Sequence, residues 1–390
     1  MLRAVIQQLG FLHTRMSEPS GQPGYLSACS SPTHRALVGL LPGLLGLPVP
    51  NRLEEDLSQI SPEHFSRIAN VHHMHTVLSS ALRSTHNAVE HLPRDLRIYF
   101  AEMEAANRAR NLSICRQLEF LGDVFTNQGI TALVLKGSAE LLHPVFADSA
   151  QRFISDIDIL IPEAQLEAAQ DILIRLGGTS GISELVEGHH HLPVLTLPDQ
   201  PVAIELHTRL GDQLVDTILP ASQMFEGATE AATGLLLPSP SNRMTHLLAH
   251  AQISNRSYRR KSTYLRDCLE FAFMLRAWDL KTWEAAHHRF SRQGQGNIAE
   301  AFAVLVMSMF PGLVELEVPR RARTWAISTL KGFGHPQRQK RREVIDQILY
   351  MAGQFILSRQ HRAHYISMLS DSKLRALAIR THLDRLRQIK

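Results

Sequence analysis

The feature that most constrains this chain is a short apolar run that carries two aspartates. Between Phe153 and Ile161, four isoleucines stand around Asp156 and Asp158. Their alternation predicts a β-strand, and side chains two residues apart on a strand project from the same face. Two carboxylates held together in an apolar setting repel each other unless a cation compensates their charge. The run therefore predicts a buried strand with a divalent cation site.

A later apolar stretch supplies a third carboxylate. Glu205 lies between Ile204 and Leu206, so its alternation lets it face the same cleft as the two aspartates. Asp156, Asp158 and Glu205 together form a candidate magnesium site. His207 shares the face of Glu205, where it either orients the carboxylate, contacts substrate or simply packs.

A candidate phosphate site precedes the aspartates. Lys136-Gly137-Ser138 ends the apolar run 131–135, which predicts a strand, and opens a helical pattern over 138–145. A glycine at this turn lets backbone N–H groups approach phosphate oxygens, and a helix N-terminus adds a positive dipole. Lys136 and Arg152 add cationic contacts to the same triphosphate.

These segments predict an α+β chain with a small mixed-sheet module and helical flanks. The module also includes an amphipathic helix over 163–176 and a hairpin of strands 192–197 and 202–206. Helical periodicity covers 62–88, after an N-cap at Ser61, and 93–128, before a C-cap at Gly129. It returns after residue 238, near 243–254, 264–278, 281–293 and 298–309, and from 339 onward. The predicted regions are a flexible or loosely packed segment 1–60, helices 61–129, the module 130–237 and a helical domain 238–390.

The three motifs as a set resemble the nucleotidyltransferase superfamily of the DNA polymerase β type. "LVLKGSAELL", "RFISDIDILI" and "VAIELHTRL" are similar, more narrowly, to an uncharacterised bacterial nucleotidyltransferase family with L-K-G, D-I-D and E-I-H motifs. The resemblance covers about eighty residues, with a weaker likeness in "HLLAH" and "LRDCLEFAFML" downstream. The segment between Ser138 and Asp156 is longer than the commonest superfamily spacing, and the narrower family shares that length.

The resemblance implies transfer of a nucleoside monophosphate from a nucleoside triphosphate, such as ATP, to a hydroxyl-bearing acceptor, with release of pyrophosphate. It assigns two magnesium ions, for which manganese can substitute, to the catalytic residues Asp156, Asp158 and Glu205. The residues that it places at the nucleotide are Lys136, Gly137, Ser138, Arg152 and His207. The acceptor is a small molecule, a peptide or protein, or RNA. The alternative is a nucleotide- or RNA-binding regulatory module that keeps the cleft without turnover.

Other features of the sequence are less specific. The three cysteines form no C-x-x-C pair, and no apolar run reaches the roughly 20 residues that span a bilayer, so we expect a cytoplasmic protein without a membrane partner. Basic residues gather near 256–266 and 338–342, as solvated helix faces or as a phosphate-attracting surface. The run 189–191 is read as a strand edge. His246 and His250 lack the glutamate of a zinc protease motif. Asp267 is read as half of a helix-surface ion pair with Arg266, and the alternative is that it approaches the nucleotide.

Overall fold

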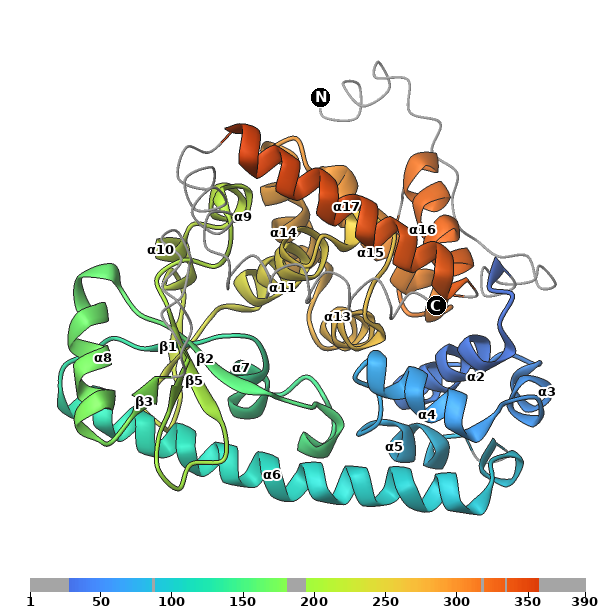
Figure 1. Ribbon diagram of the computed structural model, residues 1–390, viewed down its shortest axis with the longest axis horizontal. Helices are drawn as coiled ribbons and strands as arrows, with labels where there is room; N and C mark the ends of the chain where they lie inside the picture. The colour runs from blue at the N-terminus through green and yellow to red at the C-terminus, as the bar shows by residue number, and fades with distance from the viewer. Residues whose placement is uncertain (1–27, 86–87, 181–193, 317–318, 334, 358–390) are drawn as a thin grey trace, which may run out of the picture.

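The computed structural model describes residues 28–85, 88–180, 194–316, 319–333 and 335–357. A mixed β-sheet lies on one side of the molecule, and helices from both ends of the chain form the other side (Figure 1). The predicted α+β class is confirmed. Within the same ranges, no helix combines the length and the hydropathy needed to cross a lipid bilayer.

The N-terminal helices pack into the larger of two hydrophobic cores. The helix at 62–71 begins as expected after Ser61, whose Oγ accepts a hydrogen bond from the His64 N–H. The expected helix over 62–88 is divided into two, because the chain turns at His73, which has a φ of 56°. The elements of this region are α2 (Pro32–Leu40), η3 (Leu41–Leu45), α3 (Leu53–Ser58), α4 (Pro62–Val71), α5 (Leu78–Arg83) and η4 (Ala88–His91).

The prediction of a flexible or loosely packed segment up to residue 60 is wrong for residues 32–58. Leu37, Leu40 and Leu41 are fully buried in the larger core. Pro42 does not interrupt this packing, because it lies in the first turn of η3, where a backbone N–H has no helical partner to lose. Residues 1–27 lie outside the described ranges.

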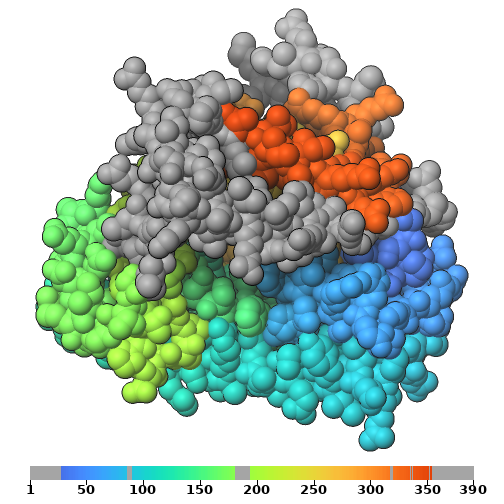
Figure 2. All heavy atoms as spheres, in the orientation of Figure 1, coloured from blue at the N-terminus to red at the C-terminus, as the bar shows by residue number. Residues whose placement is uncertain are grey.

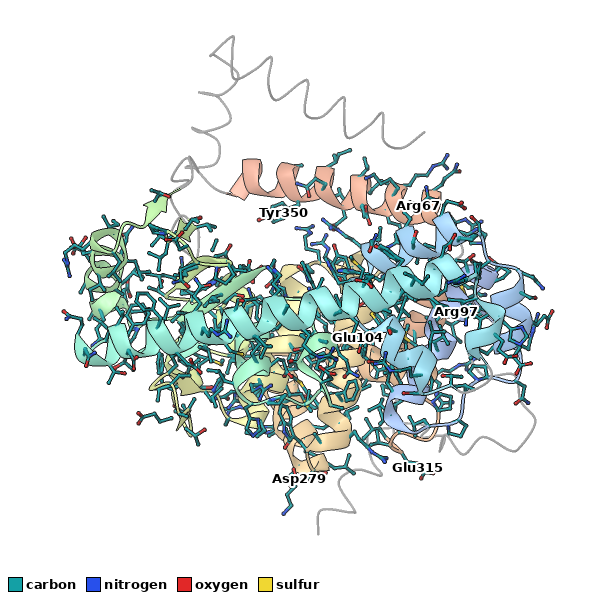
Figure 3. All side chains as sticks on the ribbon, turned by 90° about the horizontal axis from the view of Figure 1, so that it is seen from below. Arg67, Arg97, Glu104, Asp279, Glu315 and Tyr350 are labelled. Carbon is teal, nitrogen blue, oxygen red and sulfur yellow. The ribbon has the colours of Figure 1, made fainter. Side chains whose placement is uncertain are left out.

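One long helix joins the two sides of the molecule. α6 (Arg94–Asn127) has 34 residues, so it is about 50 Å long. It runs along the lower edge of the molecule, beneath the N-terminal helices and the sheet (Figure 2), and Figure 3 shows it crossing the whole face, with Glu104 between the two regions. Phe100 near its start belongs to the larger core, whereas Ile114 and Phe125 belong to the smaller core under the sheet.

α6 approaches the sheet region closely at a glycine. A Cβ on Gly122 would lie 1.7 Å from the carbonyl oxygen of Thr233, in the turn before the last strand. No larger residue fits there without moving the backbone of one of the two segments. The helix ends at Gly129, as predicted from the sequence, in a left-handed conformation with a φ of 66°.

The sheet has the strand order β3-β4-β5-β2-β1-β7-β6. β2 pairs in parallel with β5 and antiparallel with β1, so the sheet is mixed. The predicted hairpin is confirmed, since Leu195 of β4 is opposite Ile204 of β5 in an antiparallel pair. The strands are β1 (Leu133–Val134), β2 (Asp156–Leu160), β3 (Thr179–Ser180), β4 (Leu195–Thr196), β5 (Ala203–His207), β6 (Thr229–Glu230) and β7 (Leu236–Leu237). The helical elements between them are α7 (Lys136–Leu142), η5 (Ser149–Gln151), η6 (Glu163–Gln165), α8 (Leu166–Arg175), α9 (Gln213–Ile218) and α10 (Ala221–Met224).

The helices after residue 238 complete the larger core. Phe271 and Phe302 are fully buried in it, together with Phe65 from the N-terminal region. The helical regions before and after the sheet thus share one core, which also includes Leu133 of β1 and Leu160 of β2. The other core lies between the rest of the sheet and the second half of α6. The elements are α11 (Pro240–Ala249), the π-helical turn η7 (His250–Ser254), α12 (Ser257–Arg260), α13 (Leu265–Ala277), α14 (Leu280–Arg292), α15 (Gly296–Met309), α16 (Arg320–Phe333) and α17 (Pro336–Leu357).

Candidate active site

The parallel pairing of β2 with β5 brings the acidic residues together. Asp158 is directly opposite Glu205 in the register, and residues opposite each other in a pair of strands project from the same face. Asp156 and His207, each two residues away on its own strand, share that face. One ligand atom from each of Asp158, Glu205 and His207 lies within 4.8 Å of the others. Glu205 is therefore on the same side of the sheet as both aspartates.

Asp158 is the most enclosed of these carboxylates and has two cationic neighbours. Its Oδ1 lies 2.6 Å from Lys136 Nζ and 2.8 Å from His207 Nε2. Burial alone would raise the pKa of Asp158, but the Lys136 ammonium and the His207 hydrogen bond hold it well below its usual range. Burial likewise disfavours the charged form of His207, yet its hydrogen bonds to Asp158 and Glu205 raise its pKa. Asp158 is thus ionised and fixed in place.

The pKa of Asp156 shifts in the opposite direction to that of Asp158. Burial raises the pKa of this carboxyl, and the negative charge of Asp158 raises it further. A hydrogen bond from Ser155 Oγ, at 2.8 Å, only partly offsets these effects. The cluster therefore carries more negative charge than Lys136 and His207 compensate, and its ligand atoms are carboxylate oxygens and one imidazole. That donor set suits a divalent metal ion.

The first turn of α7 begins with a lysine in an uncommon conformation. Lys136 has a φ of 47°, a left-handed value that costs a non-glycine residue about 1 kcal/mol. The turn places its ammonium on Asp158. Gly137 follows, and a Cβ there would lie 2.8 Å from Ile154 Cγ1, so packing against Ile154 favours a glycine. Ser138 is buried, and its Oγ has no hydrogen-bond partner within the described part of the chain.

Arg152 reaches the same pocket but is already engaged. Its Nε donates to Glu270 Oε2 of α13 at 2.8 Å, and its Nη1 donates to the Phe153 carbonyl at 2.6 Å. Two buried asparagines of α6 hold its backbone, since Asn107 and Asn111 both donate to the Arg152 carbonyl. The guanidinium charge at the pocket is therefore balanced by a carboxylate of the helical region.

A pocket of about 190 Å³ lies between the acid cluster and the helices that follow the sheet. One wall contains Lys136, Gly137, Asp156 and Asp158. The other wall comes from α11, the start of η7 and α13, and contains Arg243, His246, His250, Arg266, Asp267 and Glu270. The pocket thus lies between the sheet region and the helices that follow it.

The second wall is the part of the site that sequence reasoning missed. Asp267 does pair with Arg266, at 3.0 Å, but the reading of a surface pair is wrong because Asp267 is only 2% exposed. His246 is also buried and lines the pocket. The weak likeness in "HLLAH" and "LRDCLEFAFML" was the signal for this wall, although periodicity alone assigns both segments to ordinary helix packing. The histidine run 189–191 lies outside the described residues.

A comparison with family models identifies the family of the chain. A family model described as an uncharacterised nucleotidyltransferase matches residues 58–311, well over half of the chain. Among solved structures, the chain is similar to the antibiotic-resistance factor ANT(2'')-Ia, with 13% sequence identity and a TM-score of 0.34; the match covers 48% of this chain and 94% of that one. No curated protein matches the sequence.

Proposed function

The chain belongs to the family of uncharacterised nucleotidyltransferases, and on that premise we propose that it transfers a nucleoside monophosphate to a hydroxyl-bearing acceptor in a magnesium-dependent reaction. The observation that carries the proposal is the in-register placement of Glu205 opposite Asp158, with Asp156 on the same face. A structural ion pair has no need of three carboxylates on one face of a sheet. A nucleotidyltransferase centre requires such a group of carboxylates.

In this proposal Asp156, Asp158 and Glu205 hold the metal. Magnesium, when bound, would neutralise charge on the triphosphate and make the acceptor hydroxyl easier to deprotonate. Glu205 takes the proton of that hydroxyl on a carboxylate oxygen, and His207 orients Glu205 through the contact between Nε2 and Oε2 at 3.5 Å. The acceptor oxygen forms a bond to the α-phosphorus, the bond from that phosphorus to the bridging oxygen breaks, and pyrophosphate leaves.

The first turn of α7 binds the triphosphate. Gly137 brings the backbone close to the phosphates, and the buried Ser138 hydroxyl donates to one of their oxygens. The Lys136 ammonium, which a strained backbone conformation holds against Asp158, binds the phosphates from that position. Arg152 adds positive charge from the pocket wall, but Glu270 offsets it, so its contribution to affinity is smaller than that of Lys136.

The test is label transfer from α-labelled nucleoside triphosphates in cell extract, with magnesium or with a chelator. We expect label on an extract component and release of pyrophosphate, both abolished by the chelator. Asp158→Asn and Glu205→Gln each lower the rate of label transfer more than about 100-fold. That loss is larger than the loss expected for a residue that only orients a metal ligand. Asp171→Asn, an exposed carboxylate of α8, is the matched control and keeps wild-type activity.

Two outcomes contradict the proposal. Transfer that survives both Asp158→Asn and Glu205→Gln would remove the acid cluster from the reaction. Tight binding of nucleoside triphosphate by the wild type without any pyrophosphate release would instead identify a regulatory module that binds nucleotide without turnover.

A further inference from the structure

The pocket wall opposite the acid cluster contains two buried polar atoms without partners. Asp267 in the first turn of α13 and His246 of α11 are 2% and 4% exposed, and both line the pocket. Asp267 Oδ2 and His246 Nε2 have no hydrogen-bond partner among the described residues. A buried polar atom left without a partner costs about 1–3 kcal/mol, and a bound ligand is one way to satisfy such an atom where it lines a pocket.

Asp267 is held so that one oxygen remains available. Arg266 Nε and Nη2 each lie 3.0 Å from Oδ1, and this fixes the carboxylate on the pocket wall. Oδ2 is the atom that remains, and a carboxylate oxygen can only accept a hydrogen bond. The missing group must therefore carry an O–H or N–H donor.

His246 narrows the choice of ligand. Burial lowers the pKa of this imidazole well below its usual value, so the ring is neutral, and a neutral ring nitrogen either donates or accepts according to its tautomer. His250 is the first residue of the π-helical turn η7. It lies one helical turn after His246 on the same pocket wall. π-helical turns are frequent at functional sites.

The charges around the two atoms disfavour an ion. Four cationic side chains line the pocket and disfavour a cationic group there: Lys136, Arg152, Arg243 and Arg266. Asp156, Asp158, Asp267 itself and Glu270 disfavour a further phosphate or carboxylate. A neutral hydroxyl both donates and accepts, so it satisfies a carboxylate oxygen and an imidazole nitrogen together.

We propose that Asp267 Oδ2 and His246 Nε2 form a subsite for a neutral, hydroxyl-bearing, sugar-like group of a substrate. The group lies across the pocket from Asp156 and Asp158. This inference rests on the proposed function, because it takes the pocket to be a substrate pocket. The hydroxyl comes from one of two sources, the ribose of the nucleotide or the acceptor, and both present the same chemistry.

Nucleotide binding and label transfer together test the subsite in the full chain. ATP and 2',3'-dideoxy-ATP are the binding probes, and the variants are Asp267→Asn and His246→Gln. Asp346→Asn is the matched control, since that carboxylate is also buried and paired with arginine but does not line the pocket. The affinity of each variant for dideoxy-ATP also reports whether its pocket is folded.

A ribose ligand and an acceptor ligand give different results, and either supports the subsite. If the ribose fills it, the wild type binds ATP about 10-fold more tightly than dideoxy-ATP, and Asp267→Asn removes that preference while keeping its dideoxy-ATP affinity. If the acceptor fills it, the variants bind both nucleotides like the wild type. They then need about 10-fold more extract for half-maximal label transfer, at an unchanged maximal rate.

The results that would refute the subsite differ from those that would refute the proposed function. Wild-type behaviour of both variants in both assays refutes the subsite and leaves the proposed function standing. A wild type that neither binds nucleotide nor transfers label refutes the proposed function, and the subsite with it. A variant that loses dideoxy-ATP binding is misfolded, and the other variant then decides.

Discussion

This chain has two clusters of buried carboxylates and cations. Carboxylates outnumber the contacting cations in one cluster, and cations outnumber the carboxylate in the other. On β2 and β5, three carboxylates face one lysine and one histidine, and the pKa of Asp156 is raised by burial and by Asp158. At α17 the ratio is reversed, because the single carboxylate of Asp346 contacts three arginines of the η7–α12 segment: Arg256, Arg259 and Arg260. Hydrogen bonds from Arg256 lower the pKa of Asp346 to about 2.

The difference separates a binding centre from a structural one. The Asp346 centre is complete within the protein, with Arg256 Nε and Nη2 each 2.7 Å from a carboxylate oxygen, and it fastens α17 to the rest of the helical domain. The carboxylates on β2 and β5 repel one another, since the charges of Asp158 and Glu205 raise the pKa of Asp156. Repulsion among carboxylates, more than burial or proximity, marks the centre that suits a cationic ligand.

The largest effect that tests this contrast comes from removing one carboxylate charge at each centre. Asp156→Asn lowers pyrophosphate release more than about 100-fold, beyond the loss of an orienting residue, while the free energy of unfolding stays equal or rises because a repelled charge is removed. Asp346→Asn shows the reverse, with activity within about twofold of wild type and a lower free energy of unfolding. Denaturant unfolding and pyrophosphate assays on both variants provide the check. A shared loss of activity and stability in Asp156→Asn would end the comparison.

A smaller effect concerns the cations of the two centres. Lys136→Met raises the KM for nucleoside triphosphate about 10-fold, because a charge-assisted contact with the triphosphate is lost. Arg260→Met, which removes a cation from Asp346, leaves that KM unchanged. Steady-state kinetics over a range of nucleotide concentrations measures both values. An unchanged KM in Lys136→Met would make this lysine a fixed counter-ion of Asp158 like the arginines of Asp346.

The smallest effect is the pH dependence of the Asp346 centre. Its folded pKa of about 2 lies below the unfolded value of about 3.9, so its contribution is complete above pH 4 and is lost as the pH falls through 2. We expect Asp346→Asn to unfold with about 1 kcal/mol less free energy than wild type between pH 5 and 8, a modest value because Arg259 is mostly exposed. The difference vanishes near pH 2. Urea titrations at several pH values measure it, and a constant difference down to pH 2 would contradict the assignment.

The strand that carries the acid pair was predictable, and so was the module around it. Alternation around Asp156 and Asp158 placed both carboxylates on one face, and β2 follows that pattern. The position of Glu205 was a looser inference, because alternation gives a face but no partner strand. Only the register of β2 with β5 determines that Glu205 is opposite Asp158.

The second pocket wall could not be derived in the same way. His246 and Asp267 lie on helices whose apolar periodicity is ordinary, and burial of a polar side chain depends on the segments that pack over it. The same limit explains residues 32–58, which were assigned to a flexible or loosely packed segment although their apolar side chains pack in a core built mainly from distant helices. Composition describes a segment, whereas burial depends on its neighbours.

The long helix α6 limits where the chain can be cut to give a folded fragment. Ile114, Leu118 and Phe125 cover the apolar side of the sheet, and Gly122 lets the helix reach Thr233. A fragment cut at residue 130 would expose that surface to water, although every proposed catalytic side chain would still be present. A catalytic fragment must therefore keep α6 at least from Asn107, which holds the Arg152 backbone, and we expect this part of the helix and the sheet to unfold together as one cooperative unit.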